Sequence, residues 1–235
     1  MFKSKKNKKI QICIDGPAGS GKSVLGIFLA QKFNLLYIDS GIIYRAFVFF
    51  CLQNKINFND LKKIKKNIKI FNVSFQSKKI IVINNNEAIN IKNFYKSIIN
   101  ENLNFVTNNA FLRKKVVKIL RAMSKNNDVV MVGRDIGSVV LKKAKIKIFL
   151  DASLKQRIQR RFKQKTLTNL NLDFKKVKEN LIKRDNFDIN RKNGALKHVK
   201  NEIYFDNSSL NVWQTNQKIV TLLLKKYKFL KIYND

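Results

Sequence analysis

The segment Gly16–Ser23 constrains the fold of this chain more than any other feature. It reads GPAGSGKS and matches the pattern G-x-x-x-x-G-K-[ST] in full. The apolar stretch that ends at Asp15 predicts a short buried strand before it, and apolar residues at helical spacing after Ser23 predict a helix. A strand, a glycine-rich turn and a helix in this order form the context in which such a loop binds phosphate. The sequence therefore predicts a P-loop protein that binds a nucleoside triphosphate.

Each part of this motif has a chemical reason. The glycines let several backbone N–H groups converge on phosphate oxygens at the start of a helix. The ammonium group of Lys22 can bridge the β- and γ-phosphates, and the Ser23 hydroxyl can ligate Mg²⁺. We expect ATP to lie on Gly16, Pro17, Ala18, Gly19, Ser20, Gly21, Lys22, Ser23 and Val24.

Strand and helix patterns alternate along most of the chain. Besides the strand that ends at Asp15, further strands are predicted to end at Asp39 and to span 129–132, 145–150 and 203–205. Helices are predicted for 41–52, from about Asn109 onward, after Ser153, after an N-cap at Asp173, and at the C-terminus. This alternation predicts a P-loop α/β fold of three layers, α/β/α, with a five-stranded parallel sheet.

The middle of the chain breaks the alternation. Short strand patterns separated by asparagine-rich turns predict a small antiparallel insert at 67–104. The core domain then comprises 1–66 and 105–235.

The composition is strongly basic, with 49 Lys and Arg against 15 Asp and Glu and a formal net charge of +34. Only nine of the basic residues are arginine, and the lysines are scattered among Asn and Ile along almost the whole chain. We interpret this pattern as a compositional bias that produces a weak, salt-sensitive attraction to polyanions. A basic RNA-associated protein that uses a nucleotide as a switch is the alternative from a different class.

Cysteine and histidine are scarce. The two cysteines, Cys13 and Cys51, stand far apart in apolar contexts, and His198 is the only histidine. Neither a disulfide framework nor a zinc-ligand spacing is present in the sequence. The chain also lacks the run of about 18–20 apolar residues that a membrane-spanning helix needs, and no signal-peptide pattern follows Met1. These features predict a cytoplasmic protein.

The few arginines stand where a phosphate-rich pocket would form. Several lie in segments that follow predicted strands or a helix, namely DSGIIYR, VGRDIG and RDNFDINR. Ligands of parallel α/β sheets gather at the carboxyl ends of the strands. A planar, permanently charged guanidinium also binds phosphate bidentately. The pattern favours a kinase whose second substrate is itself a phosphate ester.

Taken together, the segments IDGPAGSGKS, LYIDSGIIYRA, VVMVGRDIGSVV, KIKIFLDASLKQRIQRR, RDNFDINR and IYFDNSSL resemble the bacterial cytidylate kinase family, in the family's order. The resemblance implies a monomeric kinase that uses ATP and Mg²⁺ to phosphorylate CMP or dCMP. It also implies that the insert serves the monophosphate and that a lid carrying arginines lies at about 155–172. Kinases for UMP, AMP or dTMP remain alternatives within the enzyme class.

The resemblance also implies a role for each matching residue. Arg45, Arg134 and Arg191 would hold the CMP phosphate, while Ser40, Arg113 and Asp135 would read the cytosine. Arg184 and Asp188 would contact the pentose, and Arg157 and Arg161 would close over the transferring group. Lys22, Arg134, Arg157 and Arg161 would thus be catalytic.

The chain departs from the family pattern at two positions. The family usually has Arg where Phe187 stands and Pro near Ala195. A small polar residue expected before the helix of Arg113 aligns with Asn104. Ser23 is the expected metal ligand, and the position of a second carboxylate that organises Mg²⁺ is left open between Asp15 and Asp39.

Overall fold

The computed structural model describes residues 9–68, 71–76, 79–84, 87–88, 94, 97–166 and 173–233. Its main sheet has five parallel strands in the order β2-β6-β1-β7-β8. The strands are β1 (Gln11–Asp15), β2 (Leu36–Asp39), β6 (Val129–Val132), β7 (Ile146–Asp151) and β8 (Ile203–Asp206). The predicted five-stranded parallel sheet is confirmed.

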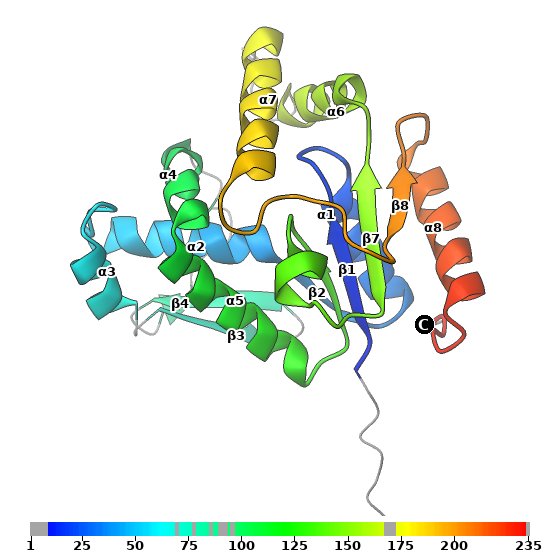
Figure 1. Ribbon diagram of the computed structural model, residues 1–235, viewed down its shortest axis with the longest axis horizontal. Helices are drawn as coiled ribbons and strands as arrows, with labels where there is room; N and C mark the ends of the chain where they lie inside the picture. Colours follow the sequence, from blue (N-terminus) through cyan, green and yellow to red (C-terminus); the bar gives the residue numbers. More distant parts are fainter. Residues whose placement is uncertain are drawn as a thin grey trace, which may run out of the picture.

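Helices cover both faces of this sheet (Figure 1). They are α1 (Lys22–Lys32), α2 (Ser40–Gln53), α3 (Leu61–Asn67), α4 (Ser97–Asn108), α5 (Ala110–Lys125), α6 (Leu154–Thr166), α7 (Phe174–Asn190) and α8 (Val212–Lys226), with one π-helical turn, η2 (Ile136–Val140). The predicted N-cap is confirmed, since the Asp173 side chain accepts the N–H of Lys175 at the start of α7. Helix α4 was not anticipated from the sequence.

Alternate residues of the central strands enter two different cores. Ile12 and Ile14 of β1 pack in the core under α1 and α8, whereas Cys13 between them packs in the core under α2, α4 and α5. Val129 and Met131 of β6 likewise enter the second core. Because side chains of a strand alternate between the two faces, a buried parallel strand must be apolar at every position. These two cores give the predicted three layers.

A second, smaller sheet follows α3. Its strands are β3 (Asn72–Gln76), β4 (Lys79–Asn84) and β5 (Glu87–Ala88), in the order β3-β4-β5 with antiparallel pairing. It lies within the range predicted for the insert, parts of which fall outside the described residues. The last part of the predicted lid, 167–172, also lies outside them.

The carboxyl ends of the strands face α6 and α7 (Figure 1). Helix α6 follows β7 directly, and α7 packs against α6 through Phe162 and Phe174, whose ring centroids lie 5.2 Å apart. The P-loop and the loop after β6 leave the sheet at this same end. The fold therefore brings the motif-bearing segments together.

Within the described residues, no helix is both long and apolar enough to cross a membrane.

Candidate active site

The glycine-rich loop joins β1 to α1 and packs against β7. A Cβ on Gly16 would overlap the backbone carbonyl of Leu150, and the residue has φ +149°. Only glycine therefore lets the loop approach this strand so closely. The loop ends at Gly21, the N-cap of α1. The amides at the start of α1 carry the positive end of the helix dipole, which favours an anion at this place.

Lys22 is the buried charged group of this loop. Its Nζ donates to the Pro17 carbonyl at 2.6 Å and to Ser20 Oγ at 3.3 Å. Burial, together with repulsion from Arg134, holds the pKa of Lys22 well below its ordinary value. Ser23 and Val24, by contrast, are exposed on the first turn of α1. The Ser23 hydroxyl is thus accessible to a hard cation on the loop.

The loop after β6 carries Arg134 and Asp135 and is tied to the sheet at its base. The Ser40 hydroxyl, at the start of α2, donates to the Val132 carbonyl at 3.0 Å. Asp15 at the end of β1 accepts the N–H groups of Ile136 and Gly137. These bonds fix the backbone before Arg134 and after Asp135, which are adjacent in the sequence.

Arg113 and Asp135 form a buried ion pair. Arg113 extends from α5, where its Nη1 also donates to the Thr107 carbonyl at 3.1 Å, and its guanidinium lies 5.7 Å from the ring centroid of Tyr44. Burial raises the pKa of Asp135, while the positive charges of Arg113 and Arg191 oppose the increase. The structure therefore brings together a carboxylate and a guanidinium that were predicted to read one base.

Asp188 is the centre of an arginine cluster. Its Oδ2 accepts Arg134 Nε at 2.8 Å and Arg184 Nε at 3.1 Å, and its Oδ1 lies 3.5 Å from Arg191 Nη1. The residue has no exposed surface. Burial alone would raise its pKa, but the three guanidinium groups hold the pKa below its ordinary value.

Arg191 connects the two carboxylates, because its Nη2 lies 3.7 Å from Asp135 Oδ1. Its Nε donates to the Gly194 carbonyl at 2.6 Å. The connected group contains four guanidinium groups, of Arg113, Arg134, Arg184 and Arg191, and two carboxylates. Two positive charges are therefore not balanced within it, which suits a dianionic ligand such as a phosphate monoester.

The remaining predicted arginines differ in their placement. Arg157 on α6 lies at the P-loop, where its Nη1 donates to the Ala18 carbonyl at 3.1 Å. Arg161 lies on the exposed side of the same helix and donates to Gln164 at 2.9 Å. Arg45 on α2 places its guanidinium beside Gly41. The structure thus places Arg157 at the predicted ATP loop, whereas Arg161 lies at an exposed position of α6.

Comparison with known proteins identifies the family of this chain. The family model described as cytidylate kinase matches residues 12–226. The chain belongs to the cytidylate kinase family. It is 36% identical over 222 residues to the cytidylate kinase of Fusobacterium nucleatum subsp. nucleatum, covering 94% of this chain and 99% of that one. It is 37% identical over 216 residues to that of Clostridium botulinum strain Hall, covering 92% and 98%.

A solved structure, of an uncharacterized protein from Eubacterium ventriosum, matches with a TM-score of 0.53 and 11% identity over 93% of this chain and 99% of the other. At that identity the match supports the fold alone.

The sequence of this cytidylate kinase family member did not reveal two polar residues that hold the P-loop. Asp185 on α7 accepts the Ala18 N–H and pairs with Arg157. Asn207, after β8, donates from Nδ2 to the Ser20 carbonyl at 3.0 Å and accepts Arg160 Nη1 at 2.8 Å. Both residues stand in segments that carry the family resemblance. Neither set of contacts can be read from a motif, because the partners are 28 or more residues apart in the sequence.

Phe187, one of the two departures from the family pattern, lines a surface hollow. Its volume is about 470 Å³, and it is lined by Asn104, Phe105, Asn108, Asn109 and Phe187. Phe187 thus lies beside Asn104 and Asn108 of α4 and Asn109 at its end.

Proposed function

We propose that this enzyme transfers the γ-phosphoryl group of ATP to CMP or dCMP, giving ADP and CDP or dCDP. The observation that carries the proposal is the buried Arg113–Asp135 pair beside a cluster with two unbalanced positive charges. Cytosine offers an exocyclic amine donor next to ring-nitrogen and carbonyl acceptors, so a carboxylate and a guanidinium match its edge. The adjoining charge suits the phosphate of the same nucleotide.

The roles within the monophosphate site follow from position and charge. We assign the CMP phosphate to Arg134 and Arg191, with Arg45 as the third arginine. We assign the cytosine to Arg113 and Asp135, with Ser40 holding the loop beneath them, and the pentose to Arg184 and Asp188. The ion pairs at Asp135 and Asp188 preorganise these side chains before substrate arrives, which lowers the cost of binding.

ATP is assigned to the loop Gly16–Val24. The accessible Ser23 hydroxyl at the start of α1 would hold Mg²⁺, which prefers oxygen ligands, and the bound cation would neutralise phosphate charge. Asp15 and Asp39 both accept backbone N–H groups, from Gly137 and Gly41 respectively, so each is held in a fixed orientation.

The reaction needs no covalent enzyme intermediate. An anionic phosphate oxygen of CMP attacks the γ-phosphorus in line, the new P–O bond forms, and the bond to the β–γ bridging oxygen breaks to release ADP. Lys22, Arg134 and Arg157 neutralise the charge that spreads over the transferring group, and Arg161 joins them if the lid closes. Closure of the lid also excludes water, which suppresses hydrolysis of ATP.

The remaining assignments rest on the family resemblance. We propose that 67–104 is the insert that binds the monophosphate, that about 155–172 forms the lid, and that the core comprises 1–66 and 105–235. The enzyme is proposed to act as a cytoplasmic monomer. The aromatic ring of Phe187 lies beside Asn104. We expect this ring to affect the preference of the enzyme for CMP over dCMP.

The test is formation of CDP from ATP and CMP with and without Mg²⁺. Lys22→Met should lower kcat by about 10³-fold or more, because the ammonium group neutralises charge at the transferring phosphoryl group. Lys32→Met, at the other end of α1, is the matched control and should leave the rate unchanged. Near-normal turnover by the Lys22 variant would contradict this mechanism.

A further inference from the structure

The Asp185 carboxylate joins three elements of the site. It accepts the backbone N–H of Ala18 in the P-loop at 3.1 Å, and it pairs with Arg157 of α6. Asp185 itself belongs to α7 and is only 7% exposed. One buried carboxylate of α7 therefore contacts both the P-loop and Arg157, the first arginine of the proposed lid.

Arg157 is held on the loop by further contacts. Its Nη1 donates to the Ala18 carbonyl at 3.1 Å, and its Nε donates to the Ala152 carbonyl at 2.9 Å. A Cβ on Gly19 would lie 3.2 Å from the Arg157 carbonyl oxygen and 3.3 Å from its Cβ. Helix α6 therefore packs directly against the P-loop at this arginine, which fixes the direction of its guanidinium.

The same face of α7 carries Asp188. Residues three apart are neighbours on a helix surface, so Asp185 and Asp188 lie one above the other. Asp188 pairs with the arginines assigned to the CMP phosphate and pentose, Arg134, Arg184 and Arg191. Two buried carboxylates on one helix thus pair with arginines of both substrate sites: Asp185 with Arg157 on the ATP side, and Asp188 with arginines on the CMP side.

We propose that Asp185 is a positioning residue for phosphoryl transfer. It fixes Arg157 against the P-loop and ties both to α7, the helix that carries Arg184 and Asp188. The inference rests on the proposed function, and it assigns to Asp185 no contact with substrate. A guanidinium held in place before the reaction stabilises developing charge without reorganising, so losing its partner lowers the rate of transfer.

The test compares kcat and KM for four enzymes, the wild type, Asp185→Asn, Arg157→Met and the double variant. Asp185→Asn retains an acceptor for the Ala18 N–H but loses the ionic partner of Arg157. We expect kcat to fall by about 10- to 100-fold, as for a misplaced catalytic group, with KM for CMP within about twofold of the wild-type value. The double variant should be no slower than Arg157→Met, because Asp185 acts through Arg157.

The double variant also separates positioning from folding. Asp185→Asn alone leaves a buried guanidinium unpaired, which destabilises a protein, whereas the double variant leaves no unpaired charge. If the fold-decrease in kcat of the double variant equalled the product of the decreases in the two single variants, the inference would be overturned. So would an Asp185→Asn enzyme with unchanged kcat, or one whose only defect is a raised KM for CMP.

Glu179→Gln is the matched control, since it removes one negative charge from an exposed position of the same helix. It should behave as the wild type. A wild-type enzyme that forms no CDP from CMP would overturn the proposed function itself. A wild type that forms CDP while Asp185→Asn matches Glu179→Gln would overturn only the inference about Asp185.

Discussion

The Asp15 carboxylate accepts the backbone N–H of Gly137 at 2.7 Å, across 122 residues of sequence. Its other oxygen accepts the N–H of Ile136 at 2.8 Å. Asp15 ends β1 immediately before the P-loop, and Ile136 begins the turn that follows Arg134 and Asp135. One buried side chain therefore sets the distance between the loop assigned to ATP and the loop assigned to CMP.

Asp15 should make stability depend on pH. Burial raises its pKa from an ordinary 3.8 to about 6, against the two N–H donors, which lower it. At pH values between the two pKa values, the folded protein binds more protons than the unfolded chain. The contribution of Asp15 to stability is therefore fully present below about pH 4 and is lost as the pH rises through about 6. Relative to Asp15→Asn, whose amide does not titrate, the wild type should lose roughly 2–3 kcal/mol of unfolding free energy between pH 4 and 7.

Urea unfolding of both proteins across this pH range measures the difference. Titrations of all other groups are common to the two proteins and largely cancel. A difference that stays constant with pH would show that Asp15 has no raised pKa in the folded protein.

Gly194 should tolerate no side chain. It has φ +64°, and a Cβ there would overlap both Arg113 Nη2 and Asp135 Oδ2. Gly194→Ala should therefore cost about 1–3 kcal/mol of stability, through crowding and backbone strain, and displace the pair assigned to cytosine. We expect Kd for CMP to rise at least about tenfold, since 1.4 kcal/mol of lost binding free energy already has that effect. Calorimetric titration with CMP checks this, with Asn193→Ala in the same loop as control. Unchanged affinity in Gly194→Ala would exclude the assigned role of the pair.

Asp188→Asn should destabilise the protein by about 3–5 kcal/mol, because three arginines lose their shared buried counter-ion. The same change adds one uncompensated positive charge to the cluster. Inorganic phosphate should therefore raise the Tm of the variant more than that of the wild type. Thermal unfolding with increasing phosphate measures both effects. Equal phosphate shifts in the two proteins would mean that Asp188 does not neutralise an anion site.

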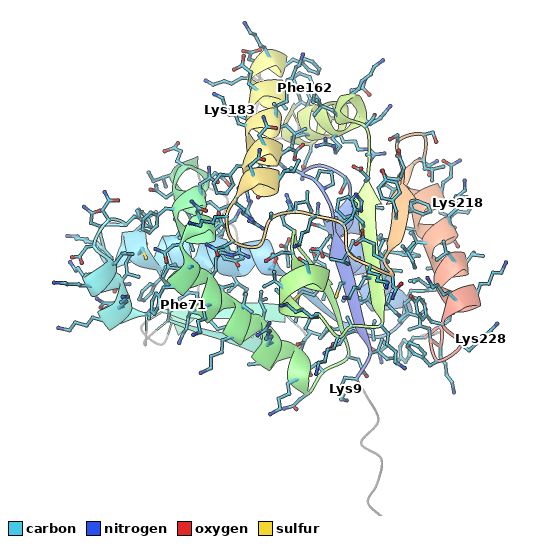
Figure 2. The ribbon with its side chains drawn as sticks, in the orientation of Figure 1. Lys9, Phe71, Phe162, Lys183, Lys218 and Lys228 are labelled. Atoms are coloured by element: carbon cyan, nitrogen blue, oxygen red, sulfur yellow. The ribbon has the colours of Figure 1, made fainter. Side chains whose placement is uncertain are left out.

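The lysine charge should produce only weak binding to nucleic acid. Lys183, Lys218 and Lys228 project from different parts of the surface (Figure 2). Scattered charge of this kind binds polyanions through counterion release, so filter binding of RNA should fall steeply with salt and vanish at moderate concentrations. Tight binding that persists at high salt would favour the RNA-associated alternative.

The sequence predicted the parts of the fold that depend on local pattern. The P-loop, the five core strands and the Asp173 cap each follow from apolar spacing or from a capping residue within a few positions. Helix α4 was missed because the preceding strand-like segments were extended over it. Local pattern sufficed where the structure is determined by neighbours in the chain.

The candidate site could be named from the sequence, but its pairings could not. The family resemblance pointed to Arg134, Asp135 and Asp188 without indicating that Asp188 binds Arg134 across 54 residues. Asp185 was missed altogether, since its partners come from two other elements. Such contacts arise only when the sheet brings its strand ends together.

Turnover of CMP, dCMP, UMP, AMP and dTMP by the wild-type enzyme, side by side with ATP and Mg²⁺, tests the central claim most directly. The Arg113–Asp135 pair predicts the highest kcat/KM for CMP or dCMP. A higher kcat/KM for AMP or dTMP than for both cytidine nucleotides would contradict the assignment.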